Sequence, residues 1–168
     1  MSEQSDYHVS MIIGKTITTT LENTQKELKS RAYRASNELR NASLFVLRGQ
    51  RSGNEYTVPG TGRMKYNKKD KTATIHYKKY RASAPGEPPA VRTGVFRLSW
   101  GTRVHVEKSG NEYKVVSSIE SNVRVGNYLL GEILEEGSER MAPRPYKQRV
   151  RNRAMPKIQA IYNKPYKV

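Results

Sequence analysis

Cysteine is absent from the 168-residue sequence. This absence excludes a disulfide framework and a thiolate metal site, and it fits a reducing compartment. Long apolar runs are absent as well, because no stretch approaches the roughly 20 residues of a membrane span. The first residues, MSEQSDYHVSMIIGK, include an acid at Glu3 and no apolar run long enough for a signal peptide. We therefore expect a soluble protein with no membrane partner.

Side chains suited to catalysis are also scarce. The aspartates are Asp6 and Asp70, which fall near the N-terminus and in an expected turn, and this leaves little for two-metal phosphodiester hydrolysis. His8, His76 and His105 lack metal-ligand spacing, and the last two alternate with apolar neighbours as exposed strand histidines do. The sequence therefore predicts no enzyme, and no catalytic residue, metal or cofactor.

Positive charge, by contrast, is abundant. The sequence has 31 lysines and arginines against 15 aspartates and glutamates, which gives a net charge of +16. Such an excess indicates an anionic partner such as nucleic acid, an acidic protein surface or phospholipid headgroups. No acidic residue follows Glu139, so the C-terminal stretch is strongly basic and is either a contact surface or a solvated tail.

Apolar residues spaced by three, four or seven predict one long helix over residues 13–48, preceded by an N-terminal arm at 1–12. Its apolar stripe consists of Ile13, Ile17, Leu21, Leu28, Ala35, Leu39, Ala42 and Phe45. Gly49 suits the C-terminal end of the helix. Either the helix breaks near Thr18 to Thr20, where β-branched residues weaken it, or it reaches out to a neighbouring subunit.

Two hairpins are predicted after the helix. Residues 61–80 alternate apolar and polar side chains on both sides of a basic tip at 68–71, and residues 95–124 do so on both sides of SGNE at 109–112. The expected apolar faces of the second hairpin are Leu98, Trp100, Val104 and Val106 on one strand and Tyr113, Val115, Ile119 and Val123 on the other. The tyrosines and lysines of the first hairpin either grip single-stranded nucleic acid by stacking or belong to an ordinary half-exposed sheet.

The last section predicts short helices over residues 126–163 and a tail at 164–168. Gly137 suits the end of the first helix and Pro145 the first turn of the second, in which Pro156 should cause a kink or an interruption. The whole order predicts a single α+β domain. It has a long N-terminal helix, an antiparallel sheet of about four strands from two hairpins, and short C-terminal helices.

The stiffest segment is SAPGEPPAVRTG, residues 83–94. Pro85-Gly86 suits the centre of a type II turn, Pro88-Pro89 imposes an extended path, and Thr93-Gly94 marks a sharp turn into the next strand. No GK[ST] follows, so the segment is not a phosphate-binding loop. A preshaped segment loses little entropy when a partner docks on it, so we expect a docking element and not a flexible linker.

Two motifs resemble one known family. SAPGEPPAVRTG followed by VFRLSW is similar to the pattern SAPGEPPxxxTGxLRxSI of the head-tail joining, or tail-completion, proteins of long-tailed bacteriophages and related prophages. Arg97 and Ser99 match that pattern, while Phe96 and Trp100 replace a leucine and an isoleucine. The stretch ILEEGSERMAPRPY, residues 133–146, is similar to the family's YLExGTxxMxxRPF. The matching positions of this second motif are Leu134, Glu135, Gly137, Met141, Arg144 and Pro145.

The resemblance implies a small α+β subunit of the virion neck, made in the host cytoplasm. Members of the family commonly assemble as a hexameric ring, with the head connector or head-closure protein on one side and the tail tube or tail terminator protein on the other. Genomic DNA passes through such a ring without sequence recognition. The basic hairpin and the C-terminal tail are more charged than the family core, so the resemblance implies no role for them.

Interface or loop-shaping roles are expected for residues of the two motifs, namely Pro85, Gly86, Pro88, Pro89, Thr93, Gly94, Arg97, Glu135, Gly137, Met141, Arg144 and Pro145. Contacts with DNA or an acidic partner are expected for basic residues of the first hairpin and the last helix, namely Lys68, Lys69, Lys71, Lys78, Lys79, Arg149, Arg151 and Arg153. We also expect Glu135 and Arg144 to form an ion pair that fixes the SERMAP turn between them. The other interpretation of the two charges is that both are solvated.

Two other functional classes stay open. A free nucleic-acid-binding module would also suit a basic chain with 11 tyrosines. A small nuclease comes last, because the carboxylates that its metals would need are missing.

Overall fold

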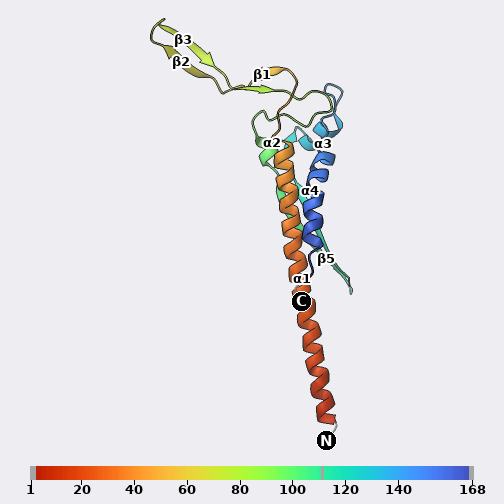
Figure 1. The fold of residues 1–168 in the computed structure, drawn as a ribbon. Helices are drawn as coiled ribbons and strands as arrows, with labels where there is room; N and C mark the ends of the chain where they lie inside the picture. Colours follow the sequence, from red (N-terminus) through yellow and green to blue (C-terminus); the bar gives the residue numbers. More distant parts are fainter. Residues whose placement is uncertain (1–2, 111, 167–168) are drawn as a thin grey trace.

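The computed structural model describes residues 3–110 and 112–166, and it describes the side chains of the first helix from Thr19 onward. The fold is α+β, as the sequence predicts, with a long N-terminal helix, small antiparallel strand pairs and short C-terminal helices (Figure 1). The elements are α1 (Glu3–Val46), β1 (Glu55–Thr57), β2 (Arg63–Asn67), β3 (Thr72–His76), β4 (Lys79–Arg81), α2 (Val95–Leu98), β5 (Gly101–Ser109), β6 (Glu112–Glu120), β7 (Arg124–Val125), β8 (Tyr128–Leu129), α3 (Leu130–Glu136) and α4 (Lys147–Tyr162).

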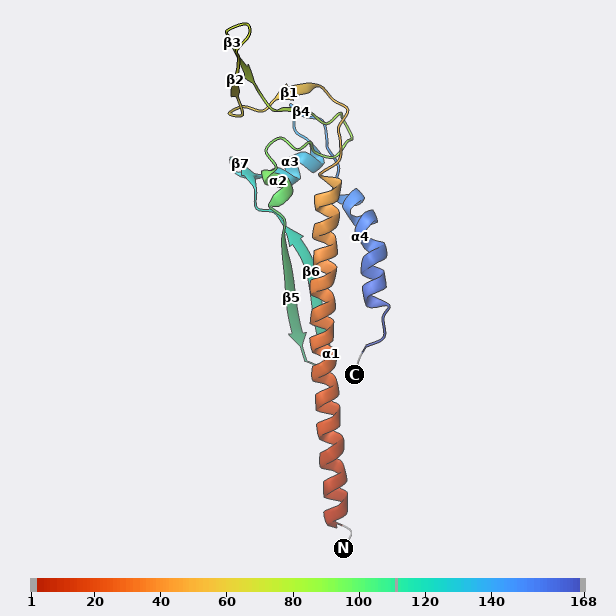
Figure 2. The same cartoon turned by 60° about the vertical axis from the view of Figure 1, so that its left-hand side comes forward.

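Helix α1 is the spine of the molecule. It runs without a break through Thr18 to Thr20 and begins at Glu3, inside the expected N-terminal arm. The β5–β6 hairpin lies along one side of α1 and α4 along another (Figure 2). The N-terminal part of α1 extends beyond all of these elements (Figures 1 and 2). The helix was expected either to break near Thr18 to Thr20 or to reach out to a neighbour. The expected break is wrong.

Small residues on α1 form the centre of the core. The fully buried positions of its contact face are Ala32, Ala35, Ser36, Ala42 and Ser43. Because these side chains are short, α4 and the hairpin approach the helix closely. The buried apolar cluster joins this face to α4 and consists of Ala42, Leu47, Tyr146, Val150 and Ala154.

The predicted apolar stripe of α1 is only partly correct. Ala35 and Ala42 are buried, but Leu21 and Phe45 are more than half exposed. Phe45 instead carries the Arg153 guanidinium over its ring, 3.3 Å from the centroid. Leu28 and Leu39 are half-buried, and Ile13 and Ile17 lie outside the described side chains. The buried serines show why a purely apolar pattern misplaces the stripe.

Both predicted hairpins form, but their strands do not merge into one sheet. The structure has four separate two-stranded sheets, which pair β1 with β4, β2 with β3, β5 with β6, and β7 with β8. In the β5–β6 pair, Val104, Val106, Tyr113, Val115 and Ile119 are half-buried, in agreement with their predicted faces. Helix α1 contacts both strands of this pair, so it covers the face of the hairpin that carries these half-buried residues.

The segment after the Pro-rich loop is a helical turn, α2, and not the predicted strand. Gly94 has a φ of 86° and precedes the turn. Phe96 and Trp100, four residues apart, contact each other with ring centroids 5.5 Å apart, while Leu98 points away and is 64% exposed. The apolar residues of this segment therefore follow the helical spacing of four, not the strand spacing of two.

The C-terminal section has the two predicted helices, with corrections. Tyr128 and Leu129 form the strand β8, and Pro145 precedes α4, which begins at Lys147, so it is not in the first turn. Helix α3 ends at Gly137, whose φ is 85°, and α4 packs Tyr146, Val150 and Ala154 against α1. Pro156 lies inside α4, which continues to Tyr162, so the expected interruption is wrong. Proline removes one hydrogen bond of the helix, and the packing of α4 on α1 offsets that loss.

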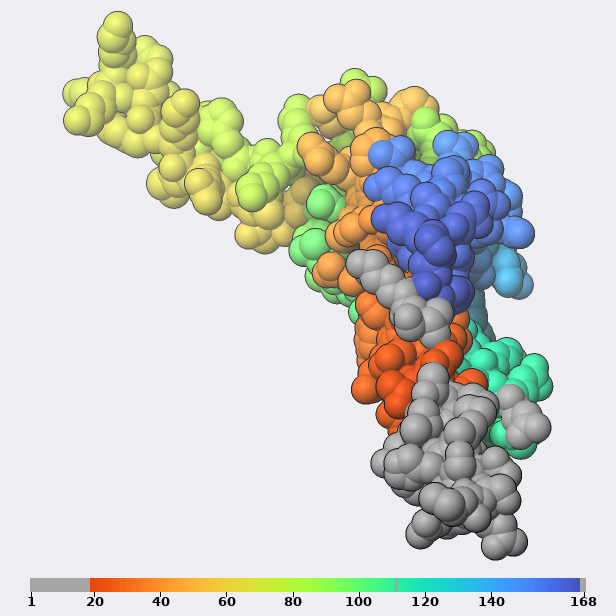
Figure 3. Space-filling view, turned by 60° about the horizontal axis from the view of Figure 1, so that its bottom comes forward, coloured from red at the N-terminus to blue at the C-terminus, as the bar shows by residue number. Residues whose placement is uncertain are grey.

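Two parts of the molecule project from the body, namely the N-terminal part of α1 and the β2–β3 hairpin. The β2–β3 hairpin extends away from the other elements (Figures 1 and 3), and all residues of both strands are exposed. The chain has an accessible surface of 12886 Å². A compact protein of 19.2 kDa exposes about 8,400 Å². The chain thus exposes about one and a half times the surface of a compact domain of its mass.

Candidate functional site

The Pro-rich loop begins with the turn that its sequence predicts. Glu87 N–H donates to the Ala84 carbonyl oxygen at 3.1 Å, and Gly86 has a φ of 78°. A bond from the fourth residue to the first, with a positive φ at the third, defines a type II turn with Pro85-Gly86 at its centre. Both central residues are exposed, so the tip of the loop faces solvent.

The carboxylate of Glu87 holds this turn to the segment that follows α1. It accepts hydrogen bonds from Ser52 N–H at 3.1 Å, Ser52 Oγ at 2.8 Å and Ala84 N–H at 2.9 Å. Three donors favour the ionised carboxylate and lower the pKa of Glu87 to about 2, chiefly through the backbone of Ser52. No pattern in the sequence predicts this role of Glu87, although it is the one acid among the prolines of this loop.

Two arginines fasten the rest of the loop. Arg51 Nη2 donates to the Val46 carbonyl oxygen at 2.9 Å and to the Pro89 carbonyl oxygen at 3.0 Å, so it links the end of α1 to the loop. Arg149 Nη2 donates to the Gly86 carbonyl oxygen at 3.2 Å. Burial lowers the pKa of Arg51 from its ordinary value, and nearby Arg149 acts in the same direction. Arg149 was expected to contact DNA or an acidic partner; this exposed side chain binds the Gly86 carbonyl oxygen of its own chain.

The inner half of the loop is packed against the body. Pro88 and Pro89 are buried, and Ser83 Oγ donates to the Pro88 carbonyl oxygen at 2.8 Å. Gly86 N–H donates to the Pro143 carbonyl oxygen at 3.1 Å, which ties the first motif to the second. The loop is therefore a braced part of the domain and not a flexible linker.

The second motif forms a tight turn after α3. Ser138 and Met141 pair as an isolated bridge, and Arg144 N–H donates to the Leu134 carbonyl oxygen at 2.7 Å. Gly137 is required here by its positive φ and because a Cβ would lie 2.8 Å from the Met141 carbonyl oxygen. These backbone contacts fix the SERMAP turn.

Glu135 does not pair with Arg144, so the expected ion pair is wrong. Its Oε2 atom accepts hydrogen bonds from Tyr146 N–H at 2.9 Å and Lys147 N–H at 3.1 Å. The first N–H groups of a helix have no partner inside the helix and carry partial positive charge, so they compete well for a carboxylate. Glu135 therefore caps the N-terminal end of α4, which begins two residues after Pro145.

Three aromatic rings connect the two motifs. Phe96, Trp100 and Tyr146 contact one another edge to face, with centroids 5.5 to 5.9 Å apart. The Tyr146 hydroxyl donates to the Gly131 carbonyl oxygen at 3.2 Å. Burial, together with the charge of Glu135, raises the pKa of Tyr146 to about 12. The tyrosine therefore remains a neutral hydrogen-bond donor.

A groove of about 550 Å³ lies where the two motifs meet, between the loop, α2, β7 and α3. Predicted site residues that line it are Pro89, Thr93, Gly94, Arg97, Met141 and Arg144. Apolar side chains supply most of the other lining, among them Leu47, Val91 and Leu134, and no acidic residue is included. Arg97 Nε and Arg144 Nη1 are buried and donate to no atom of the described residues. We call this site the two-arginine groove.

The expected DNA-contacting residues do not share one surface. Lys68, Lys69 and Lys71 are exposed at the tip of the β2–β3 hairpin, and Lys78 follows β3. Lys79 forms an exposed ion pair with Glu55 at 2.9 Å. On α4, Arg151 is exposed and Arg153 stacks on Phe45.

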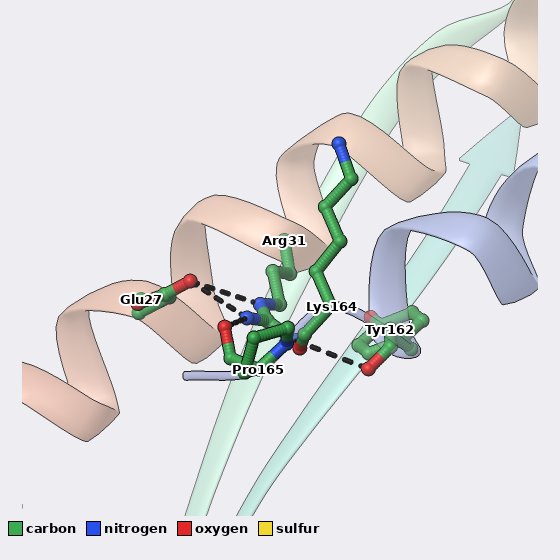
Figure 4. A network of polar contacts seen from close by, with 5 residues as sticks. All are labelled: Glu27, Arg31, Tyr162, Lys164 and Pro165. Carbon is green, nitrogen blue, oxygen red and sulfur yellow. Dashed lines mark hydrogen bonds and ion pairs between the residues drawn. The ribbon is translucent and has the colours of Figure 1, made fainter. Parts of the chain in front are cut away.

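Arg31 forms a polar cluster that no pattern in the sequence predicts (Figure 4). Its side chain is 1% exposed and binds Glu27 at 2.7 Å. The guanidinium also donates to the carbonyl oxygens of Tyr162, Lys164 and Pro165, and it lies 3.9 Å from the ring centroid of Tyr166. It thereby fastens the segment after α4 to α1. We call this cluster the Arg31 clasp.

Among the described side chains, those of residues 19–110 and 112–166, no group of acidic and histidine residues is placed to hold a metal ion. Across the same residues, no helix combines the length and the apolarity that crossing a membrane requires. His76 and His105 are exposed strand residues. In comparisons with protein-family models, curated proteins and solved structures, the chain matches none.

Proposed function

We propose that this chain is a structural subunit of a bacteriophage head-tail interface, which assembles into a ring that joins the head connector to the tail and lets DNA pass. The observation that carries the proposal is the large exposed surface of the chain, about one and a half times that of a compact domain. A subunit whose surface is completed by neighbours has this property, because apolar side chains that lack a partner in one copy are covered in the assembly.

Exposed apolar side chains on the projecting parts support assembly. Met64, Tyr66, Ile75 and Tyr77 on or beside the β2–β3 hairpin are 47 to 74% exposed. An isolated two-stranded hairpin is only marginally stable in water, so a neighbour that covers one face would stabilise it. The braced Pro-rich loop supports the same proposal, since it presents a fixed shape to a partner.

The net charge of +16 suits the two kinds of partner that such a ring meets, DNA and acidic protein surfaces. Lysines and arginines that face a channel hold DNA through phosphate contacts without reading its sequence. Those on the rim match acidic surfaces of the rings above and below. DNA must pass through the ring, so we assign most of these charges to the rim.

A second function, a free nucleic-acid-binding module, is favoured by one feature. The β2–β3 hairpin exposes Tyr66 and Tyr77 beside the lysines of its tip. Bases stack on exposed aromatic rings and phosphates pair with neighbouring lysines, so this hairpin has the side chains to hold a single strand.

Size-exclusion chromatography with light scattering, at low and at high salt, separates the two functions. We expect a discrete ring, or a monomer that assembles only with phage neck proteins. A monomer that ignores those proteins but binds free single-stranded DNA with a steep salt dependence would contradict the ring and support the module. Hydrolysis of DNA with added magnesium or manganese would contradict both.

A further inference from the structure

The two-arginine groove contains donors that its own chain leaves unused. Arg97 Nε and Arg144 Nη1 are buried there without a hydrogen-bond acceptor among the described residues, and neither side chain takes part in an ion pair of that part of the chain. A buried guanidinium nitrogen without a partner is costly, because it has lost water and gained nothing in return. Both arginine side chains are half-buried and line the groove, so a carboxylate brought there would form charge-assisted hydrogen bonds with their guanidinium groups.

The lining of the groove restricts what can bring that carboxylate. Leu47, Val91, Val95, Val123 and Leu134 surround the two arginines with apolar surface. A nucleic-acid phosphate would satisfy the guanidinium groups but would leave this apolar surface in contact with a hydrated backbone. A peptide that carries both carboxylates and apolar side chains satisfies both parts of the groove.

Two stretches of the sequence have this character. Residues 1–14 and 125–139 are its longest stretches without lysine or arginine, and both contain acidic and apolar residues. The second stretch is already committed, because Leu130 and Leu134 line the groove of their own copy and Glu135 caps α4. The first stretch, MSEQSDYHVSMIIG, has Glu3 and Asp6 within one helical turn, followed by an apolar run.

We propose that the N-terminal segment, residues 1–14, of one copy docks in the two-arginine groove of a second copy. The contact cannot form within one copy, because Glu3 begins α1 while Leu47, just past the other end of α1, lines the groove. At 1.5 Å per residue this helix separates the two sites by about 65 Å. Such a head-to-tail contact closes into a ring when the rotation between copies allows it. The inference thus rests on the proposed function and names its interface.

Disulfide cross-linking tests the contact directly, because the 168-residue chain has no cysteine of its own. Ser5→Cys is combined with Thr93→Cys, an exposed residue of the groove lining. Under mild oxidation we expect intermolecular dimers and higher multimers. The matched control pairs Ser5→Cys with Asn41→Cys, an exposed residue of α1 outside the groove, and it should cross-link far less. Equal cross-linking of the two pairs would overturn the proposal.

The charge pairing is tested by sedimentation of four full-length proteins. They are the original chain, Glu3→Gln/Asp6→Asn, Arg97→Gln/Arg144→Gln and the combination of all four changes. We expect each double variant to weaken self-association by roughly tenfold or more, and the quadruple variant to be no weaker than either. Additive losses would overturn the pairing. Because the arginine variant can also destabilise the domain, the glutamate and aspartate variant, at the far end of α1, decides the outcome if thermal unfolding shows such a loss.

Failure of this inference is distinguishable from failure of the proposed function. A ring that forms with neither the cross-link nor the charge dependence would overturn the docking of residues 1–14 and leave the ring intact. A cross-linked dimer that never closes into a ring, even with phage neck proteins, would support the docking and contradict the proposed function.

Discussion

At the scale of single residues, the Arg31 clasp shows how much one buried side chain can organise. Arg31 is 1% exposed, and it holds Glu27 and three carbonyl oxygens of the C-terminal segment. Its flat guanidinium reaches these acceptors together, which the single ammonium of a lysine cannot do. Glu135 and Glu87 act comparably, since each carboxylate binds backbone N–H groups from a distant segment. Charged residues here fasten segments of the backbone to one another.

We predict that Arg31→Ala lowers the free energy of unfolding by about 2 to 4 kcal/mol. Arg31→Lys should recover only part of this loss. Urea unfolding measures the stability, and hydrogen exchange at Asn163 and Lys164 should accelerate in both variants. Arg34→Ala is the control, because Arg34 is exposed on the same helix. Equal unfolding midpoints for Arg31→Ala and Arg34→Ala would contradict a stabilising clasp.

At the scale of elements, the Pro-rich loop is divided between an exposed turn and a buried half. Pro85 and Gly86 face solvent, whereas Pro88 and Pro89 are buried and braced by Ser83 and Arg51. The turn, together with Arg92 and Thr93 at the other end of the loop, is exposed to a partner. The buried prolines act on the stability of the loop, because they restrict the unfolded chain and pack against the body.

We predict that Pro88→Ala combined with Pro89→Ala lowers the free energy of unfolding by about 1 to 3 kcal/mol, from lost packing and from greater freedom of the unfolded chain. Pro85→Ala, at the exposed turn, should cost about 1 kcal/mol or less. Chemical denaturation of the three proteins at equal concentration measures the difference. A larger loss for Pro85→Ala would mean that the turn, and not the buried half, stabilises the loop.

At the scale of the whole molecule, part of the positive charge lies on a projecting hairpin. The β2–β3 hairpin holds Lys68, Lys69 and Lys71 away from the body, and the N-terminal part of α1 extends in another direction (Figure 1). Charges on an extended arm reach a partner before the body does. If the chain contacts DNA as proposed, we therefore expect the lysines of the hairpin tip to contribute strongly to its salt dependence.

We predict that replacing Lys68, Lys69 and Lys71 by alanine reduces the slope of log affinity for single-stranded DNA against log salt by about 2. Stability should be unchanged, because all three side chains are exposed. Fluorescence anisotropy with a short single strand at several salt concentrations measures the slope. Lys26, Lys29 and Arg34, exposed on α1, provide a control triple variant of equal charge. Equal slopes for the two triple variants would show that the hairpin tip has no special role.

The sequence by itself determined the features that depend on neighbours in the chain. The type II turn at Pro85-Gly86, the end of α3 at Gly137, the basic hairpin tip and the long helix were all predicted from local signals. Turn residues and periodic patterns act over a few positions, so they can be interpreted without the fold.

Only the tertiary structure decided which distant groups meet. Glu135 caps α4 and does not pair with Arg144, and Arg31, Arg51 and Glu87 bind backbone atoms that no pattern marks in advance. The strands form separate pairs: α1 packs on the β5–β6 hairpin, while the β2–β3 hairpin projects from the body, so the two hairpins do not meet in one sheet (Figure 1). Hydrogen bonds to backbone atoms carry no sequence signal, since every residue offers a carbonyl group and nearly every residue an N–H. The two-arginine groove has the same origin, because it exists only where two motifs about 40 residues apart in the sequence come together.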